Sequence, residues 1–313
     1  MIKLSDFSLE KRKITRLIDP KYILHHAWLS FGRKKKVVLF SEEEGGVIEL
    51  FEWLQYRNNH KYVIKINGIN KSNEKFHKLF ITTGKDKKTE AEEKEFLEKV
   101  IFINLNSKFH QIELTPKYIL EKRFGRTKAK TKIKMLNAAL IELNWDVTLS
   151  NVYFFQMGET YAKQVYLLLS VLLDYELIFL GNVNSVQEIL LINKIMKINT
   201  EIAFVIHSKN LSAINLGNIA YIYYGSETLE WGTPSELFYY PQHPYLWDII
   251  MAMPKFYQNT FQPNRGYLSK YVTETKGDPY APRNKYATNL DFEKKPPLEI
   301  KKRWEYFRNK YHE

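Results

Sequence analysis

The chain has 313 residues, of which 44% are hydrophobic and 26% charged, a balance typical of a globular protein rather than a disordered one. A formal net charge of +12 favours an acidic partner or an anionic membrane surface. The chain contains no cysteine, which excludes disulfides, thiolate zinc sites and iron–sulfur clusters built from its own residues. Its longest apolar stretch, at 165–173, is too short to span a bilayer.

The N-terminal part contains two β-like runs, at 27–31 and 36–40, separated by a basic turn. Short apolar runs on either side of a four-residue turn containing glycine predict a hairpin, and the second run is apolar enough to be a buried strand. Further along, two helices are predicted over 117–143, and a charged amphipathic helix over 298–311.

The segment 41–48 follows the second β-like run and precedes a helix predicted over 49–56. A strand, a glycine-containing loop and a helix in this order are typical of a phosphate-binding loop, G-x-x-x-x-G-K-[ST]. Gly46 occupies the second glycine of that motif, but Val47 and Ile48 replace its lysine and its hydroxyl residue. Three consecutive glutamates at 42–44 would repel a polyphosphate. This chemistry favours a solvated acidic loop over a working nucleotide site.

Residues 200–247 carry the most distinctive pattern in the chain. A buried strand predicted over 203–206 delivers His207 at its end, and a second strand is predicted over 219–224. A Gly-Thr-Pro turn, a short helix and the hexamer Pro-Gln-His-Pro-Tyr-Leu at 241–246 follow. This order resembles the nucleotide-binding subunits of ATP-binding-cassette (ABC) importers. The hexamer, together with Gly-Asp-Pro-Tyr-Ala-Pro-Arg-Asn at 277–284, narrows the resemblance to the oligopeptide/dipeptide branch.

The resemblance implies an α/β fold. It predicts an ABC-type nucleotide-binding domain, with a RecA-like core, an antiparallel β lobe and a helical subdomain, followed by a C-terminal extension. We expect the degenerate cassette domain at 1–255, with its helical subdomain at about 105–165, and an oligopeptide-importer-type tail at 256–313.

Placed on the family motifs in chain order, this sequence lacks the groups that carry ATP chemistry. Ile103 stands at the Q-loop glutamine, and Gly181 and Asn182 stand at the two Walker B acids. The implied, degenerate nucleotide positions are Gly45, Gly46, Val47, Ile48, Ile103, Gly181, Asn182 and His207, and the signature-motif equivalent is Met157, Gly158, Glu159 and Thr160. For His207, the switch histidine of the family, retention by packing or a hydrogen bond is favoured over phosphate contact.

Phosphoryl transfer depends on these groups for charge neutralisation and positioning. We therefore expect no catalytic residue, no metal and no ATP or Mg²⁺ cofactor, with weak residual ATP binding left open. The resemblance implies a pseudo-ATPase subunit of an oligopeptide-type importer, peripheral on the cytoplasmic face of the cell membrane. It would pair with an active ABC ATPase subunit, dock on a transmembrane permease near 102–115 and serve a peptide-binding protein indirectly.

Two other functions remain open. The basic stretch at 122–134 could bind nucleic acid or an anionic surface, although a solvated helix face is favoured and the run lacks interleaved aromatic residues. Alternatively, the chain could be a nucleotide sensor that retains some ATP binding through its glycine loop and His207.

Overall fold

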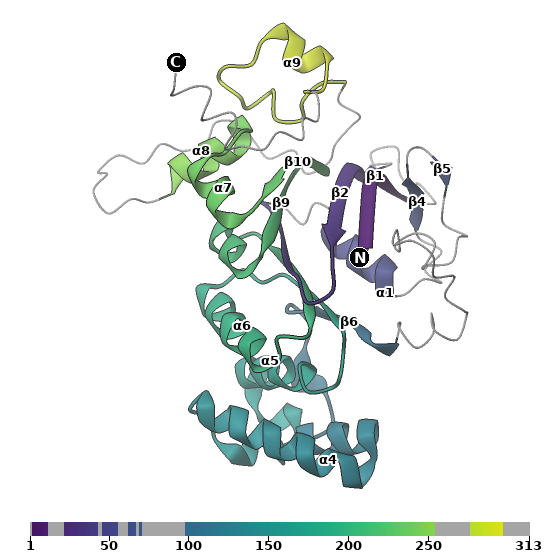
Figure 1. Cartoon of the computed structure of the whole chain (residues 1–313), viewed down its shortest axis with the longest axis vertical. Helices are drawn as coiled ribbons and strands as arrows, with labels where there is room; N and C mark the ends of the chain where they lie inside the picture. Colours follow the sequence, from purple (N-terminus) through teal and green to yellow (C-terminus); the bar gives the residue numbers. More distant parts are fainter. Residues whose placement is uncertain are drawn as a thin grey trace.

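The computed structural model describes residues 2–11, 22–42, 46–55, 62–66, 69–70, 98–253 and 276–296. The predicted helix at 298–311 lies outside these residues. The molecule is elongated, with helix α4 at one end and helix α9 at the other (Figure 1). The strands are β1 (Ile2–Lys11), β2 (Tyr22–Phe31), β3 (Lys36–Ser41), β4 (Tyr62–Ile66), β5 (Ile69–Asn70), β6 (Val100–Asn104), β7 (Leu177–Gly181), β8 (Ala203–Ser208), β9 (Ile219–Tyr224) and β10 (Glu227–Gly232).

The helices and 3₁₀ turns complete the described elements. They are α1 (Val47–Gln55), η1 (Phe109–Gln111), α4 (Pro116–Glu142), η2 (Val147–Ser150), η3 (Phe154–Gln156), α5 (Gly158–Ser170), α6 (Val186–Ile198), η4 (Leu211–Leu216), α7 (Pro234–Tyr239), α8 (Pro244–Ala252) and α9 (Asn289–Glu293). None of the helices in the described part of the chain is both long enough and apolar enough to cross a bilayer.

A six-stranded sheet in the order β10-β9-β3-β8-β7-β6 forms the centre of the molecule. All neighbours pair in parallel except β10, which runs antiparallel to β9. Parallel neighbours require crossover connections, and helices supply several of them here. The α/β class predicted from the sequence is confirmed.

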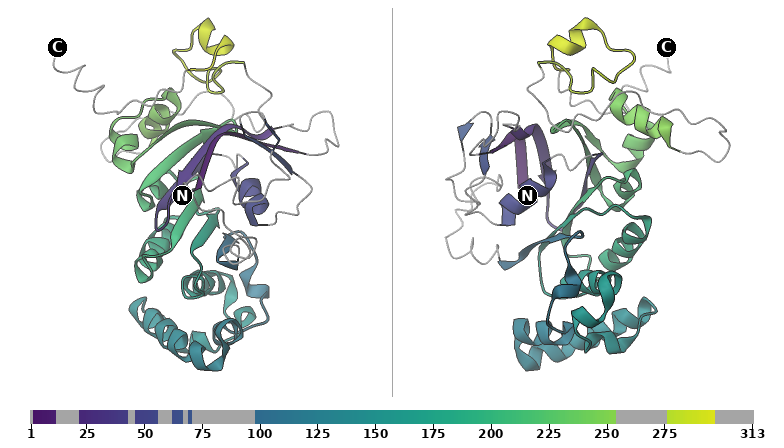
Figure 2. Two further views of the ribbon diagram at one scale, coloured as in Figure 1. Left: turned by 45° about the vertical axis from the view of Figure 1, so that its right-hand side comes forward. Right: turned by 180° about the vertical axis from the view of Figure 1, so that it is seen from behind.

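Both faces of this sheet are buried, and β3 shows how. Successive side chains of a strand point to opposite faces. Val38 and Phe40 therefore join the core that includes residues of α5 and α6, whereas Val37 and Leu39 join the core shared with α1, β1 and β2. Figure 1 shows α5 and α6 on one side of the sheet and α1 with the N-terminal strands on the other, and Figure 2 shows this arrangement from two further sides.

The N-terminal strands form a second, antiparallel sheet in the order β2-β1-β4-β5. The predicted hairpin between 27–31 and 36–40 is therefore wrong, because β2 pairs with β1 while β3 pairs with β8 and β9. The turn between them connects two sheets. Side-chain hydrogen bonds hold the sheets together: the Tyr223 hydroxyl donates to the Trp28 carbonyl at 2.7 Å, and the Trp28 N–H donates to Thr228 Oγ1 at 2.8 Å.

Helix α4 covers the region where two helices are predicted. It consists of two helical segments joined by a kink at Gly125, whose φ of 73° is not helical, so the prediction of two helices is confirmed. Most of its basic side chains are exposed: Lys122, Arg123, Arg126, Lys128, Lys130 and Lys134. Lys132 instead pairs with Asp174 at 2.5 Å.

Candidate functional site

The predicted nucleotide positions meet at one edge of the six-stranded sheet. The carboxyl ends of parallel strands lie together, and this edge is where open α/β sheets bind ligands. The register pairs Leu39 of β3 with His207 of β8 and Asn104 of β6 with Gly181 of β7. The structure thus brings Ile103, Gly181, Asn182 and His207 to the edge from which α1 starts. Gly45 lies outside the described residues.

Apolar side chains fill the start of α1. Gly46, with a φ of 80°, precedes the helix, as a glycine with no side chain can. Val47 is fully buried and Ile48 is 7% exposed, both at positions where a phosphate-binding loop carries polar groups. Ile103 is buried as well. The lysine and hydroxyl positions therefore belong to the hydrophobic interior.

A side chain at Gly181 would have to displace the side chains around it. A Cβ atom added there would lie 2.7 Å from Ile48 Cδ1 and 2.9 Å from Phe102 Cε2, both closer than real Cβ contacts. Because Ile48 occupies the space that a carboxylate at position 181 would need, the two substitutions are sterically matched.

Asn182, which the resemblance places at the second Walker B acid, has its amide nitrogen hydrogen-bonded within the chain. Asn182 adopts a φ of 63°, a conformation that asparagine tolerates better than most residues. Its Nδ2 donates to Asn104 Oδ1 at 3.0 Å, and the same oxygen accepts the Asn106 N–H at 3.0 Å. This corner of the site is uncharged, so it offers no carboxylate for a metal or for a water nucleophile.

His207 is fully buried at the end of β8, and its Nε2 lies 3.0 Å from Ser41 Oγ. Burial, with a smaller contribution from Lys209, lowers its pKa from 6.5 to about 3, so the imidazole is neutral at physiological pH. Its Nδ1 is buried with no hydrogen-bond partner among the described residues. The histidine is held by Ser41, which stands at the first glycine of the phosphate-binding motif.

Arg283 of the C-terminal tail pairs with Glu42 at the start of the acidic loop, a contact that the sequence alone did not predict. Arg283 Nη1 lies 3.1 Å from Glu42 Oε2, and the arginine side chain is 7% exposed. Its guanidinium also lies 5.6 Å from the ring centres of Tyr224 and Tyr280. Burial, and secondly the Glu42 carboxylate, raise the pKa of the nearby Tyr245. An internal ion pair therefore neutralises one of the acidic residues of the loop.

The two motifs that narrowed the resemblance contact each other. His243 of the hexamer lies with its Nε2 3.1 Å from Asp278 Oδ2 in the tail, and both side chains are buried. The Tyr245 N–H donates to His243 Nδ1 at 3.2 Å, which places the ring proton of the neutral histidine on Nε2, facing the carboxylate. Asp278 Oδ1 accepts the Tyr280 N–H at 2.8 Å. The tail is thus anchored beside α8 by charge-assisted hydrogen bonds.

The signature-motif equivalent opens α5. Met157 is buried, Gly158 has a φ of 72°, and Glu159 and Thr160 are exposed in the first turn. A carboxylate in the first turn stabilises a helix through the helix dipole. Glu159 thus places negative charge at a helix N-terminus that would otherwise attract an anion. Among the described residues, no group of three or more His, Cys, Asp or Glu side chains could hold a metal ion.

No protein-family model matches the sequence. The dipeptide transport ATP-binding protein DppD of Lactococcus lactis subsp. cremoris is 37% identical over 103 residues, which are 32% of this chain and 29% of that protein. The oligopeptide transport ATP-binding protein OppD of Bacillus subtilis is 33% identical over 105 residues, 33% of this chain and 29% of that protein. The matches therefore span less than a third of the length of these relatives.

Solved structures show the same fold. The ABC transporter component cbiO1 of Clostridium perfringens covers 76% of this chain and 90% of its own, with a TM-score of 0.50 and 11% identity. MJ0796, a bacterial ABC transporter cassette solved as a dimer, covers 75% of this chain and 99% of its own, with a TM-score of 0.50 and 12% identity. The fold of this chain is therefore that of an ABC nucleotide-binding cassette, and about a third of its sequence is similar to the ATP-binding proteins of dipeptide and oligopeptide transporters.

Proposed function

We propose that this chain is a pseudo-ATPase: a cassette subunit of an oligopeptide-type importer whose own phosphate loop neither binds nor hydrolyses ATP. The observation that carries the proposal is the contact between Ile48 and Gly181. Ile48, which stands where the resemblance places the Mg²⁺-binding hydroxyl, has its Cδ1 atom 2.7 Å from where a Cβ at Gly181 would lie, so a Walker B carboxylate there would have to displace it. Restoring either polar group alone would leave the other position incompatible with metal binding.

The remaining replacements support the same conclusion. Val47 removes the lysine charge, the Asn182–Asn104 amide pair stands in place of the carboxylate that activates water, and Ser41 holds His207. Phosphoryl transfer depends almost entirely on positioned charges, and the described residues that the resemblance assigns to those charges, Val47, Gly181 and Asn182, are all uncharged. The Glu42–Arg283 pair stabilises the loop without a nucleotide.

The role that remains is architectural or regulatory. The curated relatives are named as transport ATP-binding proteins, and one structural neighbour is a dimer of cassettes. By analogy, this subunit would pair with an active ATPase subunit and dock on a permease at the cytoplasmic face of the membrane, near residues 102–115. It would bias the open and closed states of the complex without hydrolysing ATP itself.

Titration of the purified chain with Mg-ATP in a thermal-unfolding assay tests the loss of nucleotide binding. A site with a Kd of 50 µM, for example, would stabilise the protein by about 2.7 kcal/mol at 100 times that concentration. We expect no shift of the melting temperature at millimolar Mg-ATP. Saturable stabilisation, reduced by a Gly46→Val substitution, would overturn the proposal and support the nucleotide sensor.

Affinity purification of the tagged chain from detergent-solubilised native membranes tests the partners. We expect recovery of permease subunits and of a second cassette subunit with intact ATP motifs, identified by mass spectrometry. Recovery with nucleic acid alone, released by salt, would contradict the transporter role and favour the exposed basic residues of α4 as the functional surface.

A further inference from the structure

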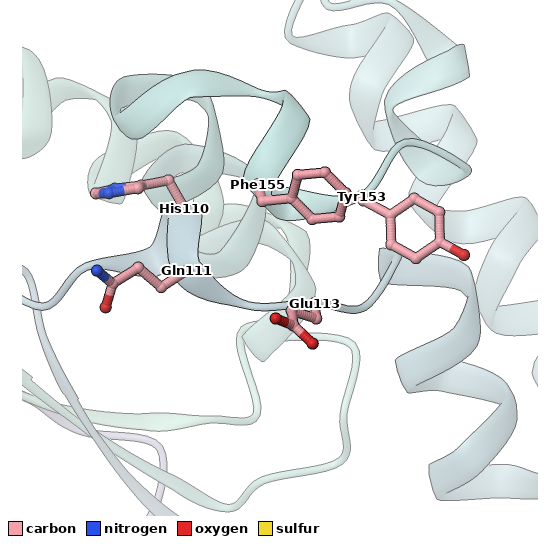
Figure 3. Close-up of a pocket in the computed structure, with 5 residues that line it drawn as sticks. All are labelled: His110, Gln111, Glu113, Tyr153 and Phe155. Carbon is pink, nitrogen blue, oxygen red and sulfur yellow. The ribbon is translucent and has the colours of Figure 1, made fainter.

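A hollow of about 660 Å³ lies at the helical end of the molecule, between η1 and η3 (Figure 3). Its lining residues are His110, Gln111, Glu113, Tyr153 and Phe155. The hollow is built from the loop that follows β6 and from the turn that precedes α5. None of its lining residues is one of the candidate nucleotide residues, although it adjoins the signature-motif equivalent at Met157.

The local packing explains why two aromatic rings face the hollow. The Phe154 N–H donates to the Leu114 carbonyl at 3.1 Å, which ties the two segments together. Phe109 and Phe154 are buried against Tyr166, with ring centres 5.0 and 5.9 Å from it. Since Phe154 fills the core, its neighbours on the 3₁₀ turn point outward.

Tyr153 and Phe155 are 45% and 53% exposed, and their ring centres lie 5.4 Å apart. Single exposed aromatic residues are common on protein surfaces, but a pair that lines a hollow indicates an interaction site. Aromatic residues are enriched at the energetic centres of protein interfaces, where they fill or form pockets.

The charge of the hollow selects the occupant. Figure 3 shows the Glu113 side chain below the two rings in this view, and all three residues line the same hollow. None of the described residues that line the hollow is a lysine or an arginine, although the chain as a whole carries a net charge of +12. Aromatic faces attract cations, and the carboxylate adds a full negative charge. A cationic group fits this lining, and an anionic one does not.

Among biological cations, a guanidinium group fits best. It is planar, stacks on aromatic rings and can donate two parallel hydrogen bonds to one carboxylate, whereas an ammonium group is a compact, strongly hydrated charge. The volume is within the range of ligand pockets and exceeds the needs of a small inorganic ion. His110 Nδ1, which is buried without a partner among the described residues, and the exposed Gln111 amide offer polar contacts for an adjoining backbone.

We propose that this hollow binds an arginine side chain presented by a partner polypeptide, with the guanidinium stacked on Tyr153 and Phe155 and paired with Glu113. Naming that partner as the permease rests on the proposed function, whereas the selectivity for arginine rests on the lining alone. The arginine would act as an anchor that sets the orientation of the docked segment.

Saturation-transfer NMR with the purified full-length chain tests the selectivity. The probes are N-acetylarginine methylamide and its uncharged isostere, N-acetylcitrulline methylamide. We expect the arginine probe to bind with a Kd of about 1 mM, from one cation–π contact and one charge-assisted pair. Glu113→Gln should weaken it about tenfold, and Phe155→Leu about threefold. Equal binding of the two probes, or no arginine binding at 20 times the expected Kd, would overturn the inference.

Two surface variants serve as matched controls. Glu142→Gln removes an exposed carboxylate from the far end of α4, and Tyr239→Leu removes a ring that is 77% exposed. Both should leave the affinity for the arginine probe unchanged. A loss of affinity in either control equal to that in Glu113→Gln would show that the probe binds non-specifically and would contradict the site.

The absence of cysteine from the chain makes the partner test direct. A Phe155→Cys variant, assembled in native membranes, is treated with a cross-linker that joins a thiol to an arginine. We expect a cross-link to a permease arginine, and none from a Tyr239→Cys control. Arginine-probe binding without this cross-link would overturn the permease docking, whereas a permease cross-link together with equal binding of both probes would overturn the arginine selectivity alone.

Discussion

The nucleotide edge of the sheet and the hollow between η1 and η3 differ in which side chains they bury and which they expose. At the edge, positions that resemble ligands for phosphate and metal are buried and apolar, as with Val47 and Ile48. At the hollow, large aromatic side chains that could have been buried are exposed instead, as with Tyr153 and Phe155. The difference separates an edge filled by packed apolar side chains from a surface on which two aromatic rings face solvent.

This comparison predicts that a polar substitution at the edge acts mainly on stability. Gly181→Asp should lower the free energy of unfolding by about 4 kcal/mol, because it introduces both a clash with Ile48 and a buried, unpaired charge. Chemical denaturation measures the loss. Gly32→Asp, at a turn where an added Cβ makes only ordinary contact, should change it by less than about 0.5 kcal/mol. A fully stable Gly181→Asp variant would contradict the filled edge.

The tail contact should show the next largest effect. Arg283→Met leaves the half-buried Glu42 without this cation and should lower the free energy of unfolding by about 2 kcal/mol, the loss of one charge-assisted hydrogen bond. The Glu42→Gln, Arg283→Met double variant should recover part of that loss. Additive losses in the double-mutant cycle would mean that the two residues do not interact.

Lowering the pH should reduce the free energy of unfolding, because His207 is buried in its neutral form. Its folded pKa of about 3 lies below the unfolded value of 6.5, so the unfolded chain binds the proton first and stability falls as pH decreases between these values. The slope contributed by this residue is about 1.4 kcal/mol per pH unit. Denaturation of wild type and His207→Gln at pH 6.5 and 4.5 should show a steeper loss in wild type. Parallel losses would place the histidine in a solvated environment.

The smallest expected effect on stability is at the hollow. Phe155→Ser removes a ring that is 53% exposed and should change the free energy of unfolding by less than about 0.5 kcal/mol, while still impairing binding of the arginine probe. Thermal unfolding measured in parallel with probe binding separates the two. A large stability loss would show that the exposed rings serve packing.

The regular elements of the six-stranded sheet could be predicted because the sequence signal for them is local. Continuous apolar runs such as those of β7 and β8 are typical of strands buried on both faces, and the structure places strands there. The hairpin between β2 and β3 failed for a physical reason. A turn such as Gly32–Lys35 has the same local chemistry whether the next strand pairs back or enters another sheet, and only long-range pairing with β8 and β9 decides it.

The order of the motifs in the sequence was enough to predict that the candidate nucleotide residues lie together. It was not enough to predict which side chains contact one another there. Ile48 packs against Gly181 because of the side-chain volumes of residues on one helix and two strands. The hydrophobic periodicity of the sequence gives no information about such volumes across elements. The Glu42–Arg283 pair spans 241 residues, and many carboxylates and arginines could have paired instead. The two exposed rings could be assigned only after Phe154 was seen to fill the core.

The span between Glu42 and Arg283 also fixes an order of events during synthesis. The loop residue leaves the ribosome 241 residues before its cation does. At translation rates of about 5–20 residues per second, the acidic loop waits roughly 12–50 s for its partner. The ion pair between Glu42 and Arg283 can therefore form only after translation has passed residue 283, late in the synthesis of the chain.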